Sequence, residues 1–176
     1  MNEIEVKVIG INCENLKEKV ISLGGKIVKK EFQENHIFSL PESIDANGYI
    51  RIRVINDHLN NLNKTFMCVK KVLSTEGVRK MDEKEFEVSD FNEAFGFLKS
   101  IDIKFISQEN KYRESYEINN SLIEFDTWDE KVFPYTYAEI ESENESKLQE
   151  IISLLEIPSE NITSKGLLQI KKEMGI

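Results

Sequence analysis

The sequence predicts an α+β fold in which eight antiparallel strands close into a β-barrel and the helices pack outside it. Two observations lead to this expectation. About eight segments alternate apolar and charged residues with the two-residue period of a strand, and short turn-forming stretches separate many of them. Apolar stripes of helical spacing lie between some of these segments, so helices are available to cover one face of the sheet.

The first half of the chain is expected to hold one helix and four strands. Residues 1–9 form the first strand, in which Ile4, Val6 and Val8 alternate with charged residues. A helix begins at Asn12 or Cys13, and Gly24-Gly25 ends it. The other strands are expected at residues 26–38, 48–54 and 65–73, with a loop at 41–48 and turns at 56–63 and 74–77.

The second half is expected to alternate strands with three helices. A strand at residues 79–89 leads to Asp90, which is a good N-cap for a helix that ends near Ser100. Asn119-Asn120 makes a tight turn between strands at 104–118 and 122–128. The last strand is expected at 137–141, and helices follow at 146–155 and 164–174.

Composition limits the classes of function. The chain has 176 residues, which suits a single domain over residues 1–176, and it is 40% hydrophobic and 31% charged. The absence of a long apolar run or a signal-peptide pattern predicts a cytoplasmic protein with no membrane partner. The formal charge of −9 argues against nonspecific nucleic-acid binding. Cys13 and Cys68 form no recognisable motif and are expected to be free thiols.

The charged faces of the strands are sorted by sign. Apolar faces covered by helices would leave these charged faces to line the interior, where unpaired buried charges are very unfavourable. Such an interior needs water, a metal ion and a multiply charged anion. Arginine suits phosphate oxygens and carboxylates suit Mg²⁺ or Mn²⁺, so a linear triphosphate with a divalent metal fits both. The basic residues are Lys7, Arg51, Arg53, Lys70, Lys111 and Arg113, and the acidic sets are Glu3/Glu5, Glu83/Glu85/Glu87, Glu124/Asp126 and Glu139/Glu141.

A simpler interpretation exists for each strand taken alone. A charged alternate face is usually the solvated face of a half-covered sheet. Sorting by sign across seven strands favours the interior instead. His36 and His58 show no metal-ligand spacing, and Trp128 is most simply a core residue. The chain has no glycine-rich phosphate loop before a helix.

The opening segment, Glu3-Ile4-Glu5-Val6-Lys7, resembles the Glu-x-Glu-x-Lys signature of the CYTH superfamily, the triphosphate tunnel metalloenzymes. Six later segments resemble the other strands of that family in the same order, and the resemblance runs the length of the chain. They are residues 49–53, 66–70, 83–88, 111–113, 124–126 and 138–141.

This resemblance implies an eight-stranded antiparallel tunnel that binds a triphosphate with Mg²⁺ or Mn²⁺. It implies phosphate contacts from Lys7, Arg51, Arg53, Lys70, Lys111, Arg113 and Lys165, and metal ligands among Glu3, Glu5, Asp126, Glu139 and Glu141. The catalytic set would be Glu3, Glu5, Lys7, Arg51, Arg53, Lys70, Lys111, Arg113 and Glu141. Glu85, Glu87 and Glu124 are further candidates for a metal or a water.

The expected function is metal-dependent hydrolysis of a triphosphate, either inorganic tripolyphosphate or an organic or nucleoside triphosphate. One alternative is a class IV adenylyl cyclase, which makes cyclic AMP from ATP in a tunnel of the same kind. Another is a noncatalytic module that binds polyphosphate or nucleotide, although intact acidic sets speak against it. A small-molecule triphosphate is the expected partner, and the oligomeric state stays open, a homodimer included.

Overall fold

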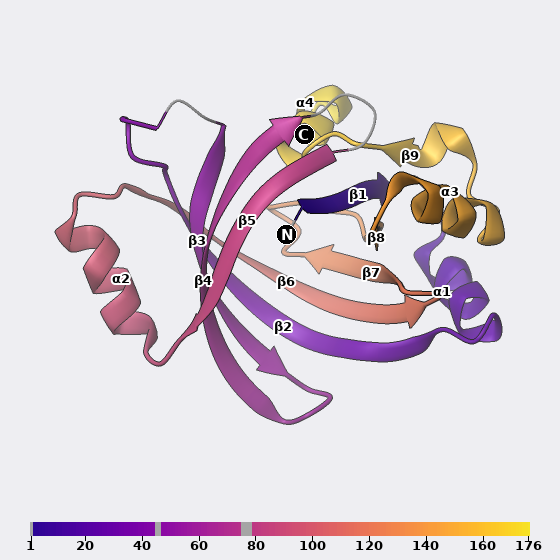
Figure 1. Ribbon diagram of the computed structural model, residues 1–176, viewed down its shortest axis with the longest axis horizontal. Coiled ribbons are helices and arrows are strands. Elements are labelled where there is room, and N and C mark those ends of the chain that lie inside the picture. Colours follow the sequence, from indigo (N-terminus) through magenta and orange to yellow (C-terminus); the bar gives the residue numbers. More distant parts are fainter. Residues whose placement is uncertain (1, 45–46, 75–78) are drawn as a thin grey trace.

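The computed structural model describes the backbone of residues 2–44, 47–74 and 79–176, and the side chains of residues 4–44, 47–73 and 82–176. Within these ranges the chain folds as an antiparallel sheet with helices around it (Figure 1). The first half comprises β1 (Asn2–Val8), α1 (Cys13–Ser22), β2 (Lys26–Phe38), β3 (Gly48–Asp57), β4 (Leu62–Ser74) and β5 (Arg79–Val88). The second half comprises α2 (Phe91–Ser100), β6 (Phe105–Ile118), β7 (Ser121–Trp128), β8 (Tyr137–Ser142), α3 (Glu145–Leu154), β9 (Ile162–Thr163) and α4 (Leu167–Met174).

The α+β class is confirmed, but the expected closed barrel of eight strands is corrected. The described part of the chain forms a nine-stranded sheet in the order β5-β4-β3-β2-β6-β7-β8-β1-β9. The extra strand, β9, is two residues long, so no alternation could reveal it in the sequence. The strand order ends at β5 on one side and at β9 on the other, and β1, the neighbour of β9, makes a further pairing with β5, from Asn2↔Asp82 to Glu5↔Arg79.

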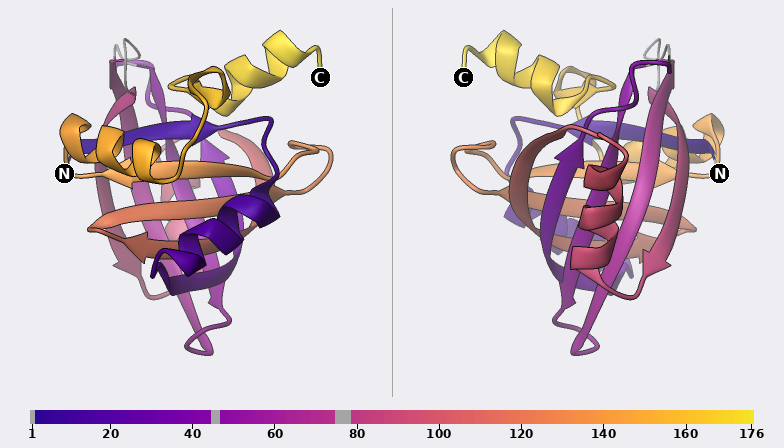
Figure 2. Two further views of the ribbon diagram at one scale, coloured as in Figure 1. Left: turned by 90° about the vertical axis from the view of Figure 1, so that its right-hand side faces the viewer. Right: turned by 90° about the vertical axis from the view of Figure 1, so that its left-hand side faces the viewer.

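The outer face of β1, β7 and β8 is covered by α1 and α3, as Figure 2 shows in its left view. Each of these helices begins at an asparagine whose side chain accepts a hydrogen bond from the backbone N–H three residues later. Val20, Ile140 and Leu148 are fully buried in the core between the helices and the strands. Burying these apolar side chains explains why the alternate, charged residues are left on the concave face.

Two smaller cores hold the other helices. The N-terminal end of α2 is capped by Asp90, and its residues Ala94 and Leu98 pack on Phe38 and Ile52 of the outer face. Helix α4 packs through Ile170 on a group of aromatic residues described below. Figures 1 and 2 show α4 at the opposite end of the sheet from the turn that joins β3 and β4.

No helix in the described ranges is both long and apolar enough to cross a membrane.

The expected elements agree with the structure apart from their ends. Strands β3 and β4 extend farther into the predicted turn at 56–63, so the turn itself spans residues 58–61. Asn61 adopts a positive φ of 54°, a conformation that asparagine tolerates. The final helix begins at Leu167 rather than at residue 164. Residues 75–77 of the predicted turn at 74–77 lie outside the described residues.

Candidate functional site

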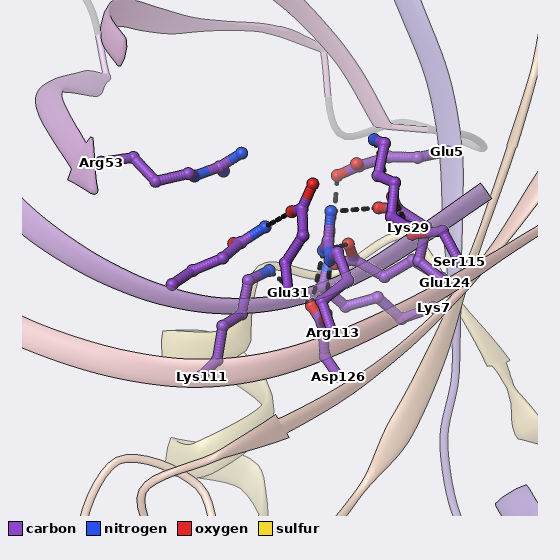
Figure 3. A network of polar contacts seen from close by, with 12 residues as sticks. Glu5, Lys7, Lys29, Glu31, Arg53, Lys111, Arg113, Ser115, Glu124 and Asp126 are labelled. Carbon is purple, nitrogen blue, oxygen red and sulfur yellow. Dashed lines mark hydrogen bonds and ion pairs between the residues drawn. The ribbon is translucent and has the colours of Figure 1, made fainter. Parts of the chain in front are cut away.

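Alternate residues of neighbouring strands place the charged side chains together on the concave face of the sheet. The register pairs Arg113 with Asp126 and with Glu31, while Glu139 faces both Lys7 and Glu124. Figure 3 shows these side chains converging from different strands. The sheet therefore has a charged concave face, as its alternating sequence predicts.

Arg113 is held by carboxylates on three sides. Its Nε and Nη2 donate to the two oxygens of Asp126, at 2.6 Å each, and Nη2 also donates to Glu139 at 2.8 Å. Its Nη1 forms an ion pair with Glu124. The Asp126 side chain has no exposed surface, and the neighbouring cations keep its pKa below the usual range despite its burial. A phosphate would therefore have to compete with these carboxylates for the Arg113 guanidinium.

Two buried lysines border the Arg113 group. Lys7 Nζ lies 2.8 Å from Glu139 Oε1 and 3.5 Å from Glu5 Oε1. Lys111 Nζ donates to Asp126 Oδ2 at 2.7 Å and lies 4.9 Å from the centre of the Trp128 ring. Burial, together with the adjacent charge of Arg113, lowers the pKa of Lys111 to about 7. Its charge is thus sensitive to pH near neutrality.

This pKa gives a testable pH dependence. If Lys111 holds a phosphate, its cationic form binds better, so its contribution is present below pH 7 and is lost as the pH rises above that value. We expect the ratio of kcat/KM for tripolyphosphate between the wild type and Lys111→Met to be largest near pH 6. The ratio should fall toward one by about pH 9. A ratio that does not change with pH would rule out this role, because ionisations shared by both proteins cancel.

A second charged group lies on β3, β4 and β5. Arg51 Nη2 donates to Glu83 at 3.4 Å and to Glu85 at 3.2 Å, and Lys70 Nζ lies 2.7 Å from Glu83. The Arg51 side chain is only 8% exposed, and its Nε has no hydrogen-bond partner among the described residues. An unsatisfied buried N–H is unfavourable, so Arg51 has a donor that a bound anion could satisfy.

Arg53 is the least neutralised of the arginines on the concave face. Its Nε donates to Asn35 Oδ1 at 3.1 Å, while the Asn35 amide donates to the backbone carbonyl of Glu109. Within the described ranges no carboxylate forms an ion pair with Arg53. Burial lowers its pKa to about 10, and the charges of Arg51 and Arg113 act in the same direction. An anion beside this guanidinium would therefore be strongly stabilised.

Two of the carboxylates that the sequence resemblance assigns to a divalent cation lie on β1 and β8. Glu5 and Glu141 lie opposite each other in the register, a pairing that is unfavourable for like charges. Burial raises the pKa of Glu141, and the negative charges of Glu124 and Glu5 raise it further. A hard cation such as Mg²⁺ or Mn²⁺ would relieve this repulsion through oxygen ligands.

Among the described residues, one group of three possible metal ligands has its ligand atoms within 4.8 Å of one another, namely Cys68, Glu83 and Glu85. Burial raises the pKa of the Cys68 thiol to about 11, so the thiol stays protonated at neutral pH. Arg51 and Lys70 already contact the two carboxylates. A hard metal cation in this group would be bound by the carboxylate oxygens and would compete with Arg51 and Lys70 for them.

The structure does not bring every candidate residue together. Lys165 lies just before α4, where its ammonium group pairs with Glu173 at 2.7 Å and its side chain is 45% exposed. The side chain of Glu87 is 57% exposed, and its Oε2 lies 3.9 Å from Lys64 Nζ. The backbone of Glu3 pairs with Met81, but the Glu3 side chain lies outside the described part of the structure.

Four polar residues of β2 also lie on the concave face, and the sequence interpretation missed them. They are Lys29, Glu31, Gln33 and Asn35. Lys29 pairs with Glu124 at 3.3 Å, and Asn35 orients Arg53. Their spacing of two residues is a signal that the sequence contains. The signal is weak because Lys30, Glu34 and His36 on the opposite face of β2 are also polar, so polar and apolar residues do not alternate along this strand.

The aromatic residue Trp128 combines two environments. Its Nε1 donates to the Tyr137 hydroxyl at 3.0 Å, and both rings belong to the core under α4. Its ring face lies beside Lys111, in cation–π contact. The core role that the sequence favours is therefore confirmed.

The charged residues thus gather on the concave face of a curved antiparallel sheet, where arginines and lysines are paired with carboxylates. The chain belongs to the CYTH family, because the model of the CYTH domain matches residues 1–166. Members of this family depend on metal ions and include triphosphatases and cyclases. No curated protein matches the chain in a sequence comparison.

Solved structures share the fold over nearly the whole chain. The PH1012 protein of Pyrococcus horikoshii is 27% identical, with a TM-score of 0.75, and the match covers 95% of this chain and 98% of that protein. HpAC1 of Hippeastrum, described as a putative adenylyl cyclase with a dominant triphosphatase activity, is 16% identical with a TM-score of 0.62, and the match covers 94% of this chain and 90% of that protein. The RNA triphosphatase domain of a mimivirus mRNA capping enzyme is 13% identical with a TM-score of 0.52, covering 89% and 88%.

Proposed function

We propose that this protein hydrolyses a triphosphate in a metal-dependent reaction on its concave face. One observation carries the proposal: cations from β1, β3, β4 and β6 face the same space as the carboxylates of β1, β5, β7 and β8. A linear triphosphate with a divalent metal satisfies both charge sets at once. Family membership and the triphosphatase activity described for HpAC1 support the reaction type.

We further propose that strands β1–β8 enclose the substrate as a tunnel. Its support is the pairing of β1 with β5, which brings the first strand of the order back toward β1. In such an enclosure the charges act in partial exclusion of water, so each contact to phosphate is stronger than it would be at a surface.

The residues then have distinct roles. Arg53 and Arg51 offer donors to phosphate oxygens, while Lys7 and Lys70 supply further positive charge from the neighbouring strands. Arg113 holds Glu124, Asp126 and Glu139 in place. Glu5 and Glu141 would hold Mg²⁺ or Mn²⁺, which when bound neutralises charge on the phosphates and on the leaving group. Together these contacts orient the anhydride for attack by water.

The existing ion pairs imply that metal and triphosphate bind cooperatively. Lys7 pairs with Glu139 and Glu5, so a phosphate alone must compete with carboxylates for the ammonium group. A metal alone must likewise compete with lysine for the carboxylates. When both arrive, cation–carboxylate pairs are exchanged for metal–carboxylate and lysine–phosphate contacts, and the charge stays balanced. Each ligand thus favours the other's binding.

The metal role of Glu141 can be tested by substitution. We expect Glu141→Gln to raise the Mg²⁺ concentration for half-maximal turnover of tripolyphosphate by about tenfold, because one anionic ligand is lost. Removing the metal with a chelator should abolish turnover by the wild type. The matched control is Glu143→Gln, two residues on and exposed. An unchanged Mg²⁺ requirement in Glu141→Gln would contradict the assignment.

Product analysis tests the proposed reaction. The purified protein is incubated with tripolyphosphate, ATP or thiamine triphosphate, each with Mg²⁺ or Mn²⁺, and the products are separated. Release of orthophosphate from at least one of them is the expected result. Pyrophosphate and cyclic AMP from ATP would identify a cyclase instead. Binding without turnover of any of the three would identify a noncatalytic module.

A further inference from the structure

Lys29 is a cation of the concave face to which the sequence resemblance assigns no role. It lies on β2, and its ammonium group is 3.3 Å from Glu124 Oε1. Burial and the charge of Glu124 raise the pKa of Glu141, and the positive charge of Lys29 opposes them. Lys29 also lines a pocket of about 330 Å³ together with Arg53. Figure 3 shows its side chain on the concave face with those of Glu124 and Arg53, so Lys29 adjoins both the carboxylates and the arginine that is available to phosphate.

The contact between Lys29 and Glu124 can be broken at little cost. Glu124 Oε1 also accepts a hydrogen bond from Ser115 Oγ at 2.9 Å, and Glu124 Oε2 forms an ion pair with Arg113 Nη1. Glu124 therefore keeps two donors when the ammonium group of Lys29 moves away. The Lys29 side chain is 40% exposed, and water weakens an ion pair at such a position.

The other lysines of the concave face are held more firmly. The side chains of Lys7, Lys70 and Lys111 are at most 14% exposed, and each pairs with a carboxylate at 2.7–2.8 Å. Moving one of these ammonium groups leaves a largely buried carboxylate with less compensation, which is unfavourable. Of the four lysines, Lys29 is thus the one that can turn to an incoming anion most easily.

We propose that Lys29 is a further substrate-binding residue, whose ammonium group leaves Glu124 and binds a phosphate oxygen of the triphosphate. A lysine suits this exchange because its charge sits at the end of a flexible four-carbon chain. The released oxygen of Glu124 keeps its hydrogen bond to Ser115, so no buried acceptor is left unpaired. The inference rests on the proposed function and adds a residue of β2 to the substrate site.

Two neighbouring lysines provide a matched pair of variants. Lys29→Met removes the charge and keeps a long apolar side chain. We expect it to raise KM for tripolyphosphate about tenfold at saturating Mg²⁺ and to change kcat less than about twofold, as for a contact that binds substrate and transition state equally. The control is Lys30→Met, because Lys30 is 45% exposed and pairs with Glu114 on the outer face. It removes the same charge and should change KM less than about twofold.

The Mg²⁺ requirement separates this role from a simpler one. If Lys29 serves only as a counterion of Glu124, Lys29→Met should lower the Mg²⁺ concentration for half-maximal turnover and leave KM unchanged. That result would overturn the inference while leaving hydrolysis established. Equal changes of KM in both variants would overturn it as well, because the effect would then come from net charge. Melting temperatures show whether the variants are folded.

The two proposals fail in different ways. If tripolyphosphate is not hydrolysed, its affinity in the presence of Mg²⁺ is measured by titration calorimetry instead. Lys29→Met should then bind tripolyphosphate about tenfold more weakly than Lys30→Met. Equal affinities would overturn the role of Lys29, and no binding to the wild type would overturn both proposals.

Discussion

Arg53→Gln is expected to lower kcat/KM for the triphosphate substrate by about 10²- to 10³-fold without destabilising the fold. The loss is large because Arg53 carries no carboxylate partner among the described residues, so its guanidinium is available to the phosphates. The fold should tolerate the change because burial and the charges of Arg51 and Arg113 disfavour the cation, lowering its pKa to about 10. Steady-state kinetics and thermal unfolding measure the two effects.

Arg51→Gln provides the matched comparison on the same strand. Arg51 neutralises Glu83 and Glu85, so its loss leaves two carboxylates with less compensation. We expect the melting temperature of Arg51→Gln to fall by several degrees, and that of Arg53→Gln to stay the same or rise by about 2 °C. If Arg53→Gln unfolded as readily as Arg51→Gln, or kept full activity, Arg53 would be a structural residue.

Asp126→Asn is expected to destabilise the protein by about 3–5 kcal/mol, because it removes the anion between two buried cations. Asp126 has no exposed surface and accepts hydrogen bonds from both Lys111 and Arg113. Asparagine has nearly the same shape, so the change tests charge rather than volume. Urea unfolding gives the free energy of unfolding directly.

The destabilisation caused by Asp126→Asn should also depend on pH, and the pKa of Asp126 gives the direction. Its folded pKa lies below the unfolded value, so its stabilisation is present at neutral pH and is lost as the pH falls through the folded pKa. The stability difference between wild type and Asp126→Asn should therefore shrink in acid. The control is Asp129→Asn, whose carboxylate forms no ion pair among the described side chains. A small effect of Asp126→Asn, with only a raised metal requirement, would instead support the metal role that the sequence resemblance implies.

The fold and most of the charged face follow from strand alternation. Ile4, Val6 and Val8 predict which side of β1 is buried, and therefore place Glu5 and Lys7 on the concave face. The partners within that face were not predictable, because they depend on strand order and register. The sequence does not reveal that Arg113 is enclosed by three carboxylates while Arg53 faces an amide.

Other features were hidden for identifiable reasons. The polar row on β2 was missed because both faces of that strand are polar, so Glu31 and Gln33 do not stand out. Lys165 could not be placed from sequence, since its position depends on the short segment before α4. The two residues of β9 are too few for a periodic pattern.

A crystal structure with tripolyphosphate and Mn²⁺ tests the central claim most directly. The account predicts phosphate density on the concave face, with Arg53 and Lys7 in contact with phosphate oxygens, and an anomalous Mn²⁺ signal beside Glu141. It also predicts that Lys7 leaves Glu139 while Arg113 stays with Asp126. Anion and metal bound on the outer face, with the Lys7–Glu139 pair unchanged, would contradict the account.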